Sequence, residues 1–339
     1  MSEHSYRPNW NIALFGIATL ILAIVCSLTA CNGDKEPYIS GIEMVQIPPD
    51  GTPKPYSFVM GSPISEVSRE AVRESPMRTV ILTKGFLLGK YPITQGQYRE
   101  ITGKSPSYHQ GDAVPDYVTN PDMLPVEYVS WYEMVEFCNR LSELEGRTKA
   151  YVINKEDSDS NNITTSRSDP KWHITLRAGS NGYRLPTEAQ WEYACRAGTT
   201  TPFNTGATIT TAQANFNGTK YLPNDTNGVR RGATTEVDFF PPNAWGLYDM
   251  HGNVYEACWD FMYNAWSEPD YINYFTDAPN PDYDPTGLTQ GERRVGRGGC
   301  YSMGPDRCRS AWRERFGAET KDYDNLGFRV ALPLNGQTW

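Results

Sequence analysis

The chain lacks the short motifs that mark common metal and nucleophile sites. It has no C-x-x-C pair, no H-E-x-x-H signature and no G-x-S-x-G turn, and it has only 4 histidines. The ThrGlyLysSer segment at 102–105 resembles the end of a phosphate-binding loop, but Tyr98 occupies the position of that loop's first glycine. These absences exclude zinc proteases of that type, hydrolases with a serine elbow and P-loop nucleotidases.

Basic residues are also in deficit. The sequence contains 31 Lys and Arg against 40 Asp and Glu, a formal net charge of −9, which makes nucleic acid a poor partner. An acidic domain of this length buries roughly three-quarters of its unfolded surface and needs no disulfide framework. Beyond Cys31 an odd number of cysteines remains at irregular spacings, and an oxidising compartment leaves their pairing open: Cys138, Cys195, Cys258, Cys300 and Cys308.

One long apolar run lies near the N-terminus, over residues 11–30. It ends in Leu28-Thr29-Ala30-Cys31, which resembles a bacterial lipobox, and polar residues follow. We therefore expect a lipoprotein signal peptide at 1–30, lipidation of Cys31 and a linker over 31–41. The alternative is a retained transmembrane anchor, since the run is long enough to cross a bilayer. Both alternatives predict that the remaining chain lies outside the cytoplasmic membrane.

Three capping-box pairs predict three helices, each followed by a glycine stop at Gly103, Gly146 or Gly198. The pairs are Thr94 with Gln97, Ser130 with Glu133, and Thr187 with Gln190. In the second helix the apolar face consists of Met134, Phe137, Cys138, Leu141 and Leu144.

Four segments have the apolar, β-branched character of strands. They are residues 44–47, 56–60, 78–88 and 327–332. We interpret residues 154–170 as an exposed polar loop, and the high content of turn-forming residues from Thr199 onward predicts mostly irregular structure. No internal repeat is present.

Several motifs follow one another along the chain: FVMGSP at 58–63, LPVEYVSWYEMVEFCNRL at 124–141, YRLPTEAQWEYACRAGT at 183–199, FPPNAWGLYDMHGNVYE at 240–256 and RVGRGG…CRSAWR…NLGFR near the C-terminus. In this order they resemble the formylglycine-generating-enzyme, or sulfatase-modifying-factor, family over about residues 42–332. The resemblance implies one domain, at 42–335, with an α+β fold of the C-type-lectin-like kind that is rich in irregular loops. Fold alone does not imply the enzyme.

Members of that family that oxidise sulfatase cysteines use a copper-binding C-x4-C thiol pair shortly after the GlyGly pair. Counting from Gly299 puts the first thiol position on Met303 and the second on Cys308, while Cys300 stands where the family usually has serine. Because the first catalytic thiol is missing, we expect no enzyme and no catalytic residue. We interpret Cys258, Cys300 and Cys308 as small core residues. An oxidase that uses Cys300 and Cys308 in a rearranged copper site is the alternative.

A second enzymatic branch with this fold is the ergothioneine-type sulfoxide synthases, whose iron site needs histidines on an additional helical domain. Only His109, His173 and His251 remain after processing, and no such domain is present. That activity is excluded, and His251 is interpreted as a turn residue.

The chain is most similar to a third branch, the treponemal-type variable lipoproteins of diversity-generating retroelements. These scramble residues near the C-terminus between fixed motifs, which implies a variable ligand-binding region at about 297–330. The ligand-binding residues implied here are Tyr301, Ser302, Met303, Gly304, Asp306, Arg307, Trp312, Glu314, Arg315, Phe316, Gly317, Glu319, Thr320, Asp322 and Tyr323. In a binding site, aromatic side chains provide contact area, Ser and Gly adapt to the shape of the ligand, and charged side chains select among ligands.

Three arginines of this region, Arg309, Arg313 and Arg329, belong to the fixed motifs. We expect them to pair with buried carboxylates and to hold loops together; the carboxylates considered are Glu192, Asp249 and Glu256. Replacing Arg309 or Arg329 by alanine is expected to destabilise the fold. Replacing the aromatic residues Tyr301, Trp312 and Tyr323 by alanine is expected to leave folding nearly unchanged.

The resemblance also allows a structural calcium ion, although no cofactor is required. The family's calcium segment matches Gly252, Asn253, Val254 and Glu256, whose oxygens suit a hard cation. A second family site matches Asn215, Phe216, Asn227 and Val229, with Asn227 in place of the usual Asp. The alternative for Glu256 is an ordinary salt bridge.

The sequence thus predicts a lipid-anchored protein on the outer surface of a bacterial membrane. Its C-terminal site is expected to bind a protein or glycan ligand without catalysis, in contact with membrane lipid through its anchor and not with nucleic acid. Two alternatives stay open: the extracytoplasmic oxidase, and an accessory lipoprotein with one fixed partner.

Overall fold

The computed structural model of this chain describes residues 41–49, 51, 55–164, 171–219, 228–262 and 281–339, which belong to one structural unit, Pro37–Trp339. The predicted signal peptide, Cys31 and nearly all of the predicted linker lie outside the described residues. Within the described ranges, no helix has both the length and the apolar character needed to cross a membrane.

The three predicted helices are present, each with the predicted capping box: α2 (Gln95–Thr102), α3 (Trp131–Leu144) and α4 (Glu188–Arg196). In each, a threonine or serine hydroxyl accepts from the backbone N–H three residues later, which satisfies a donor that has no partner within the helix. The prediction that Leu144 belongs to the apolar face of α3 was wrong, since its side chain is 38% exposed in the last turn of this helix. Three 3-10 turns and α1 (Ala71–Glu74) were not predicted; the 3-10 turns are η1 (Gly111–Ala113), η2 (Pro121–Met123) and η3 (Pro305–Cys308).

The domain contains two three-stranded sheets. One has the order β1-β4-β12, where β1 (Met44–Ile47) and β12 (Ala331–Pro333) both pair antiparallel with β4 (Phe86–Gly89) and so bring the two ends of the domain together. The other has the order β2-β3-β8, from β2 (Tyr56–Met60), β3 (Arg78–Leu82) and β8 (Asp282–Tyr283).

Two predicted strands are each divided in the structure. The predicted strand over 78–88 breaks between β3 and β4 near Gly85, where a side chain would press on the Ile47 carbonyl and Leu334. The predicted strand over 327–332 is divided into β11 (Leu326–Gly327) and β12. At both breaks the chain leaves one sheet and joins another.

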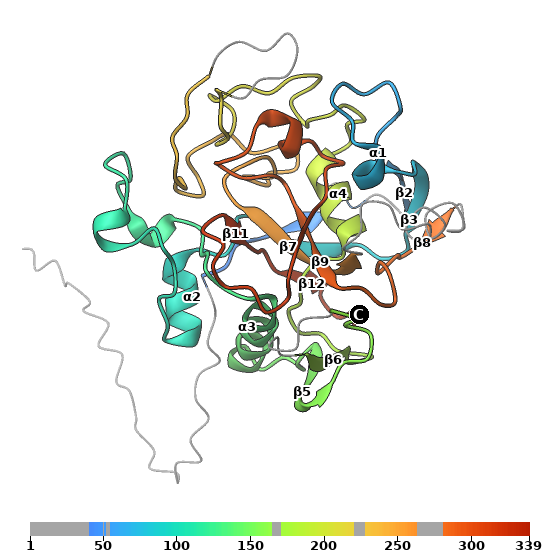
Figure 1. Ribbon diagram of the computed structural model, residues 1–339. Helices are drawn as coiled ribbons and strands as arrows, with labels where there is room; N and C mark the ends of the chain where they lie inside the picture. The colour runs from blue at the N-terminus through green and yellow to red at the C-terminus, as the bar shows by residue number, and fades with distance from the viewer. Residues whose placement is uncertain (1–40, 50, 52–54, 165–170, 220–227, 263–280) are drawn as a thin grey trace, which may run out of the picture. The chain divides into compact units, whose positions relative to one another are not determined.

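A four-stranded sheet crosses the middle of the molecule in the order β10-β9-β7-β11 (Figure 1). It consists of β10 (Glu314–Phe316), β9 (Arg293–Arg297), β7 (Tyr255–Met262) and β11, which pairs parallel with β7. Strand β7 was not predicted, because both of its faces are largely buried and no apolar-polar alternation remains in its sequence. The C-terminal region therefore begins and ends on strands of one sheet.

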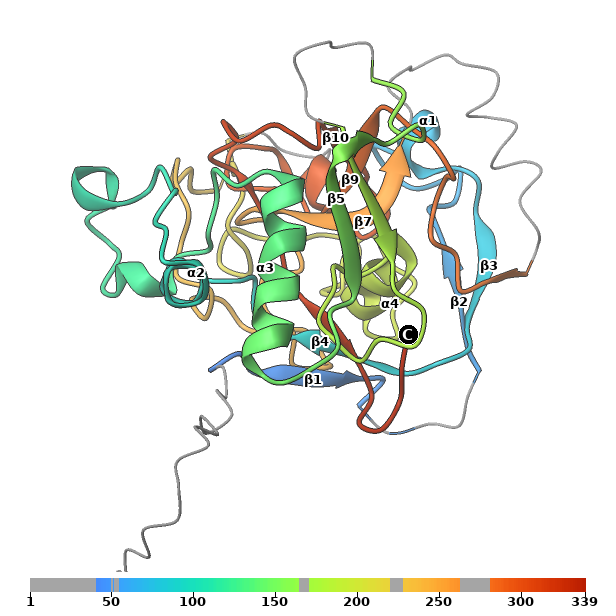
Figure 2. The ribbon, with the colours of Figure 1, turned by 90° about the horizontal axis from the view of Figure 1, so that it is seen from below.

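A separate hairpin of β5 (Tyr151–Ser158) and β6 (Trp172–Leu176) lies beside α3 (Figure 2). The interpretation of residues 154–170 as a loop was wrong at its beginning, where 154–158 continue β5. Residues 165–170 lie outside the described ranges.

Large side chains fill the core between these irregular segments. Trp131, Phe137 and Phe328 form part of one apolar cluster, and Trp191 forms part of a second cluster with α4 and β7. Arg297, Arg309 and Arg329 are also among the largest fully buried side chains. A buried charge is stable only when it is paired. The partners of these arginines therefore identify the contacts that fix the C-terminal region.

Candidate ligand-binding site

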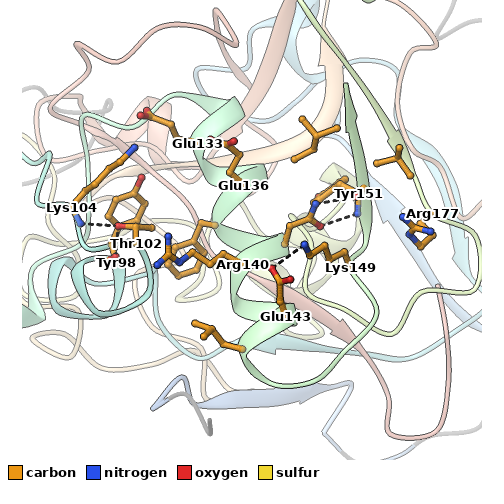
Figure 3. A pocket seen from close by; sticks show the side chains of 15 residues that line it. Tyr98, Thr102, Lys104, Glu133, Glu136, Arg140, Glu143, Lys149, Tyr151 and Arg177 are labelled. Carbon is orange, nitrogen blue, oxygen red and sulfur yellow. Dashed lines mark hydrogen bonds and ion pairs between the residues drawn. The ribbon is translucent and has the colours of Figure 1, made fainter. Parts of the chain in front are cut away.

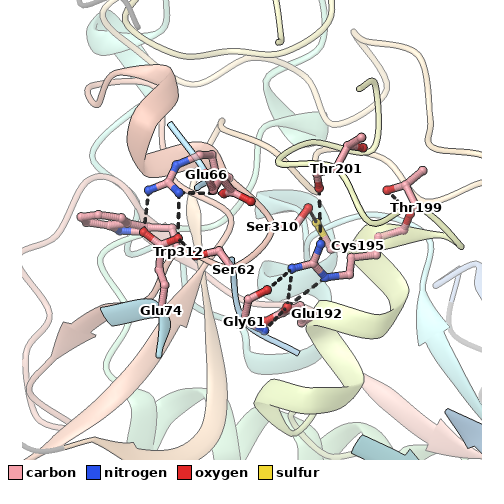
Figure 4. Close-up of polar contacts among 12 residues, drawn as sticks. Gly61, Ser62, Glu66, Glu74, Glu192, Cys195, Thr199, Thr201, Ser310 and Trp312 are labelled. Carbon is pink, nitrogen blue, oxygen red and sulfur yellow. Dashed lines mark hydrogen bonds and ion pairs between the residues drawn. The ribbon is translucent and has the colours of Figure 1, made fainter. Parts of the chain in front are cut away.

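Arg309 joins the C-terminal region to residues 61–74. Its guanidinium is fully buried and donates to Glu66 Oε1 at 2.8 Å and to Glu74 Oε2 at 2.7 Å, and its Nε donates to the Asp306 carbonyl at 2.8 Å. Glu66 and Glu74 converge on this guanidinium, and Ser62 donates to Glu74 at 2.7 Å (Figure 4). Two carboxylates thus hold η3 and the residue that follows it.

Three further arginines form comparable buried pairs. We call the four ion pairs the arginine clamps: Arg297–Glu192, Arg309–Glu74, Arg313–Glu188 and Arg329–Glu256. The expectation that Arg309, Arg313 and Arg329 belong to the scaffold is thus confirmed. The expectation of Asp249 as a partner was wrong, since its Oδ2 accepts from Asn253 Nδ2 at 3.0 Å. Glu192 binds Arg196 and Arg297 rather than the three predicted arginines.

Five of the predicted ligand-binding residues are buried: Tyr301, Gly304, Trp312, Phe316 and Gly317. The guanidinium carbons of Arg73 and Arg307 lie 4.8 and 5.3 Å from the centroid of the Trp312 ring. Tyr301 packs edge-on against His109 at 5.5 Å. Both rings are buried, and Trp312 belongs to the core cluster, so the structure contradicts the expectation that alanine at Tyr301 and Trp312 leaves folding nearly unchanged.

The other predicted positions are wholly or partly accessible, and we call them the accessible set: Ser302, Met303, Asp306, Arg307, Glu314, Arg315, Glu319, Thr320, Asp322 and Tyr323. Arg307 and Glu314 lie at its centre, with an Nη1–Oε2 distance of 3.6 Å. Glu314 also binds the buried Arg73 of α1 at 2.9 Å, so this carboxylate of the accessible set is held from a distant part of the chain. Whether the accessible set binds a ligand stays a prediction.

Two hydrogen bonds attach residues 323–325 to other parts of the chain. Asn325 Nδ2 donates to Ser302 Oγ at 3.3 Å, and the Tyr128 N–H donates to the Tyr323 carbonyl at 3.2 Å. Tyr128 has a positive φ of 59° and stacks on Tyr108, which is 53% exposed. Tyr108 and Tyr128 were not predicted as neighbours of this site, because only the fold brings residues 108–128 beside the C-terminal region.

The Cys195–His251 contact resembles a catalytic dyad by distance alone, with 3.8 Å between Sγ and Nε2. His251 Nε2 accepts from the Asn204 N–H at 3.0 Å, which leaves Nδ1 as the donor to the Cys308 carbonyl at 2.7 Å. Burial lowers the pKa of His251 to about 4 and raises the pKa of Cys195 to about 12. The histidine is a neutral link between two loops, and the thiol is not activated.

Cys300 and Cys308 are fully buried free thiols. Burial raises the pKa of Cys300 to about 11 and raises the pKa of Cys308 as well, with the neighbouring Cys300 adding to the effect. Cys258 is also fully buried, so the three cysteines lie in the core as interpreted from the sequence. Neither thiol has the solvent access or the lowered pKa of an activated cysteine.

The predicted calcium ligand Glu256 does not fit a cation. Both of its carboxylate oxygens accept from Arg329, and Oε2 also accepts from Trp191 Nε1 at 2.6 Å. Asn253 Oδ1 accepts from the Thr235 N–H at 3.0 Å. A guanidinium on the carboxylate repels a metal ion, so the set with Gly252 and Val254 lacks its charged ligand.

The second predicted calcium set is only partly described. Asn215 Oδ1 is buried and has no hydrogen-bond partner in the described part of the chain, Phe216 is buried, Val229 is 56% exposed, and Asn227 lies outside the described residues. This set stays a prediction. Among the described residues no group of three or more His, Cys, Asp or Glu side chains is arranged to hold a metal ion.

Comparison with known proteins identifies the family of this chain. The family model for the sulfatase-modifying factor enzyme 1-like domain matches residues 43–334. The chain belongs to this family. Its members include enzymes: the formylglycine-generating enzyme of Mus musculus is 33% identical over 289 residues, which cover 81% of this chain and 72% of that protein.

Other relatives in the family have different names. "Chaperone protein LppX" of Paenibacillus barcinonensis is 36% identical over 52% of this chain, and "Serine/threonine-protein kinase pkn1" of Chlamydia pneumoniae is 30% identical over 82% of it. This chain spans only 62% and 42% of the lengths of these two relatives. Their names therefore do not assign an activity to it.

Solved structures share the predicted α+β fold with its formylglycine-type, lectin-like architecture. Treponema denticola variable protein 1 has a TM-score of 0.66 and 26% identity, with 88% of this chain and 98% of that chain covered. PvdO from Pseudomonas aeruginosa has a TM-score of 0.57 and 26% identity, with 86% and 94% covered. The similarity thus includes a variable protein as well as proteins of the enzyme family.

Proposed function

We propose that this chain is a non-catalytic binding protein whose accessible set recognises a protein or glycan ligand. The separation of fixed and accessible side chains within one segment is the observation that carries the proposal. Four buried arginine clamps interrupt the segment, while ten predicted ligand-binding positions between them remain accessible. Side chains that carry little of the fold can be exchanged without unfolding the protein.

The similarity to Treponema denticola variable protein 1 supports a finer version of this proposal. In that version a diversity-generating retroelement exchanges the accessible set, and the protein is a lipoprotein anchored through Cys31 on the outer bacterial surface. The lipobox-like sequence before Cys31 supports the anchor. A site that varies between copies needs a scaffold that tolerates variation, and the arginine clamps meet that need.

The chemistry of the accessible set suits recognition of polar surfaces. Arg307 and Arg315 provide planar donors, Glu314 and Asp322 provide acceptors, and Tyr323 adds a 38% exposed aromatic ring. Such a mixture is typical of binding sites that adapt to protein or glycan ligands. Cys300 and Cys308 are fully buried, out of reach of a substrate, and this weighs against the oxidase alternative.

A binding comparison on glycan and protein arrays tests the proposal. The purified domain is compared with a triple variant, Arg307→Ala, Arg315→Ala and Tyr323→Ala, and with a control triple variant on other exposed sites, Lys84→Ala, Arg99→Ala and Glu156→Ala. We expect ligands that bind the domain and the control equally to be lost by the accessible-set variant. Equal binding by all three proteins would overturn the assignment of the site.

Copper titration addresses the oxidase alternative. We expect no tight Cu(I) binding by the native protein and no change in Cys308→Ser. Tight Cu(I) binding that disappears in Cys308→Ser would favour the oxidase and contradict the non-catalytic proposal.

A further inference from the structure

An open groove of about 770 Å³ lies between α2, α3 and the β5–β6 hairpin (Figure 3). Its volume is within the roughly 300–1,000 Å³ that ligand sites usually have. Tyr98 and Phe137 stack at 5.5 Å along one side, and Tyr151 lies on the other. None of the residues considered for the C-terminal site lines this groove, and the proposed function does not use it.

The charged side chains of the groove leave an excess of positive charge. Its three acidic residues each form an ion pair with a lysine: Glu133 with Lys321 at 2.8 Å, Glu136 with Lys155 at 2.5 Å and Glu143 with Lys149 at 2.9 Å. Within the described part of the chain, three exposed cations that line the same groove form no salt bridge: Lys104, Arg140 and Arg177. On a protein with a net charge of −9, this local cation surplus favours an acidic ligand.

One edge of β5 at the groove has no partner strand among the described residues. In the described residues β5 pairs only with β6, so its other edge faces α3. The Arg177 N–H donates to the Ala150 carbonyl at 2.8 Å, which identifies residues 150 and 177 as a hydrogen-bonded pair. Because such pairs alternate along an antiparallel ladder, the backbone groups of Tyr151 and Ile153 point away from β6.

At this edge of β5, the side chain of Asn139 makes the hydrogen bonds that a neighbouring strand would make. The Asn139 amide donates to the Tyr151 carbonyl at 2.9 Å and accepts from the Tyr151 N–H at 3.0 Å, in the pattern of a paired peptide group. The next outward-facing backbone groups belong to Ile153, which lines the groove. Exposed Leu144 and Val152 provide apolar surface on either side.

We propose that this groove binds an extended acidic peptide segment of a partner protein, which pairs with the Ile153 backbone and places carboxylates beside Lys104, Arg140 and Arg177. The strand edge favours a peptide over a glycan, because a peptide can bond to a backbone N–H and C=O in register. The exposed apolar side chains favour alternating acidic and apolar residues, since alternate side chains of a strand lie on opposite faces.

The probe is a fluorescein-labelled peptide of alternating glutamate and valine, and fluorescence anisotropy measures its binding to the full domain. We expect saturable binding that weakens as salt rises, and a loss of about fivefold or more in affinity for Arg140→Glu. Lys84→Glu is the matched control, because it makes the same charge change at an exposed position outside the groove. Thermal unfolding of both variants verifies that each is folded.

Two further probes distinguish strand pairing from charge alone. Two versions of the peptide are N-methylated at alternate residues, one at the odd positions and one at the even positions. In one version the methyl groups replace the backbone N–H donors that face β5, and in the other version these donors remain. We expect one of the two methylated peptides to lose binding and the other to retain it. Equal effects of the two methylation patterns, equal loss in Arg140→Glu and Lys84→Glu, or tighter binding of heparin than of the peptide would each overturn the proposal.

Discussion

Arg329 and Glu256 form an ion pair from which solvent is fully excluded. Nε and Nη2 of Arg329 donate to different carboxylate oxygens of Glu256, and Nη1 donates to the Gly89 carbonyl at 2.8 Å. The pair connects the C-terminal end of the domain to β7 and β4. This contact shows how the C-terminal region keeps its path while the accessible side chains between its clamps contribute little to the core.

Removal of one member of this pair will strongly destabilise the protein. Arg329→Ala leaves the Glu256 carboxylate buried without its partner, which costs roughly 3–5 kcal/mol of the free energy of unfolding. Arg307→Ala is the comparison, since that side chain is 40% exposed and its solvent-screened contact with Glu314 is worth less than about 1 kcal/mol. Urea denaturation measures both. Similar losses in the two variants would contradict the division into clamps and accessible set.

Replacing two aromatic residues of the C-terminal region by alanine will change the free energy of unfolding by different amounts. Trp312→Ala removes a buried indole from the core and is expected to cost ~3–5 kcal/mol of unfolding free energy. Tyr323→Ala, at an exposed position, is expected to change it by less than about 0.5 kcal/mol. Guanidinium denaturation gives both values. A Trp312→Ala variant with wild-type stability would place this ring at the surface.

The stability of the protein will depend on pH through Glu127. Burial raises the pKa of this carboxyl to about 7, although the Tyr108 and His109 N–H groups donate to it and oppose the shift. A carboxyl whose folded pKa is raised favours the folded state only while it is protonated. Stability is therefore lost as pH rises from about 4.5, the unfolded value, to about 7, by ~3 kcal/mol in total.

Glu127→Gln tests this dependence, because the amide has a similar shape and does not ionise. We expect the difference in unfolding free energy between the variant and the wild type to change between pH 4.5 and 7 and to stay constant above and below. Urea denaturation across this pH range provides the measurement. A difference that is independent of pH would mean that Glu127 ionises normally in the folded protein.

The buried thiols will resist modification while the protein is folded. Cys195, Cys300 and Cys308 have raised pKa values and little access to solvent, so a thiol reagent at pH 8 should label them only as fast as the protein unfolds. Mass spectrometry after native and denatured labelling compares the rates. Rapid native labelling of Cys300 or Cys308 would support the oxidase alternative.

The sequence predicts features that depend on neighbouring residues, and the structure confirms them. The capping boxes at Thr94, Ser130 and Thr187 are local patterns, so the three helices were predicted with their starts. The role of Arg309 and Arg329 as scaffold was also predicted, since a cation within a fixed apolar motif must be paired when it is buried. The partners were only partly predicted: Glu66 and Glu74 lie 243 and 235 positions from Arg309.

Other features depend on contacts that the sequence does not contain. β7 was missed because burial on both faces removes the alternation that marks a strand. The exposure predicted for Trp312 was wrong because Arg73, more than two hundred residues away, packs on the ring and joins the core around it. The groove beside α3 was missed for the same reason, since it forms only when the β5–β6 hairpin lies against that helix.

Sequencing many copies of this gene from one bacterial population tests the central claim most directly. We expect amino-acid variation to concentrate at the accessible set, with Arg297, Arg309, Arg313 and Arg329 unchanged, and a near-copy template repeat and a reverse transcriptase gene nearby. Variation spread evenly over the domain, or an invariant C-terminal region without such a repeat, would contradict the account of an exchangeable binding surface on a fixed scaffold.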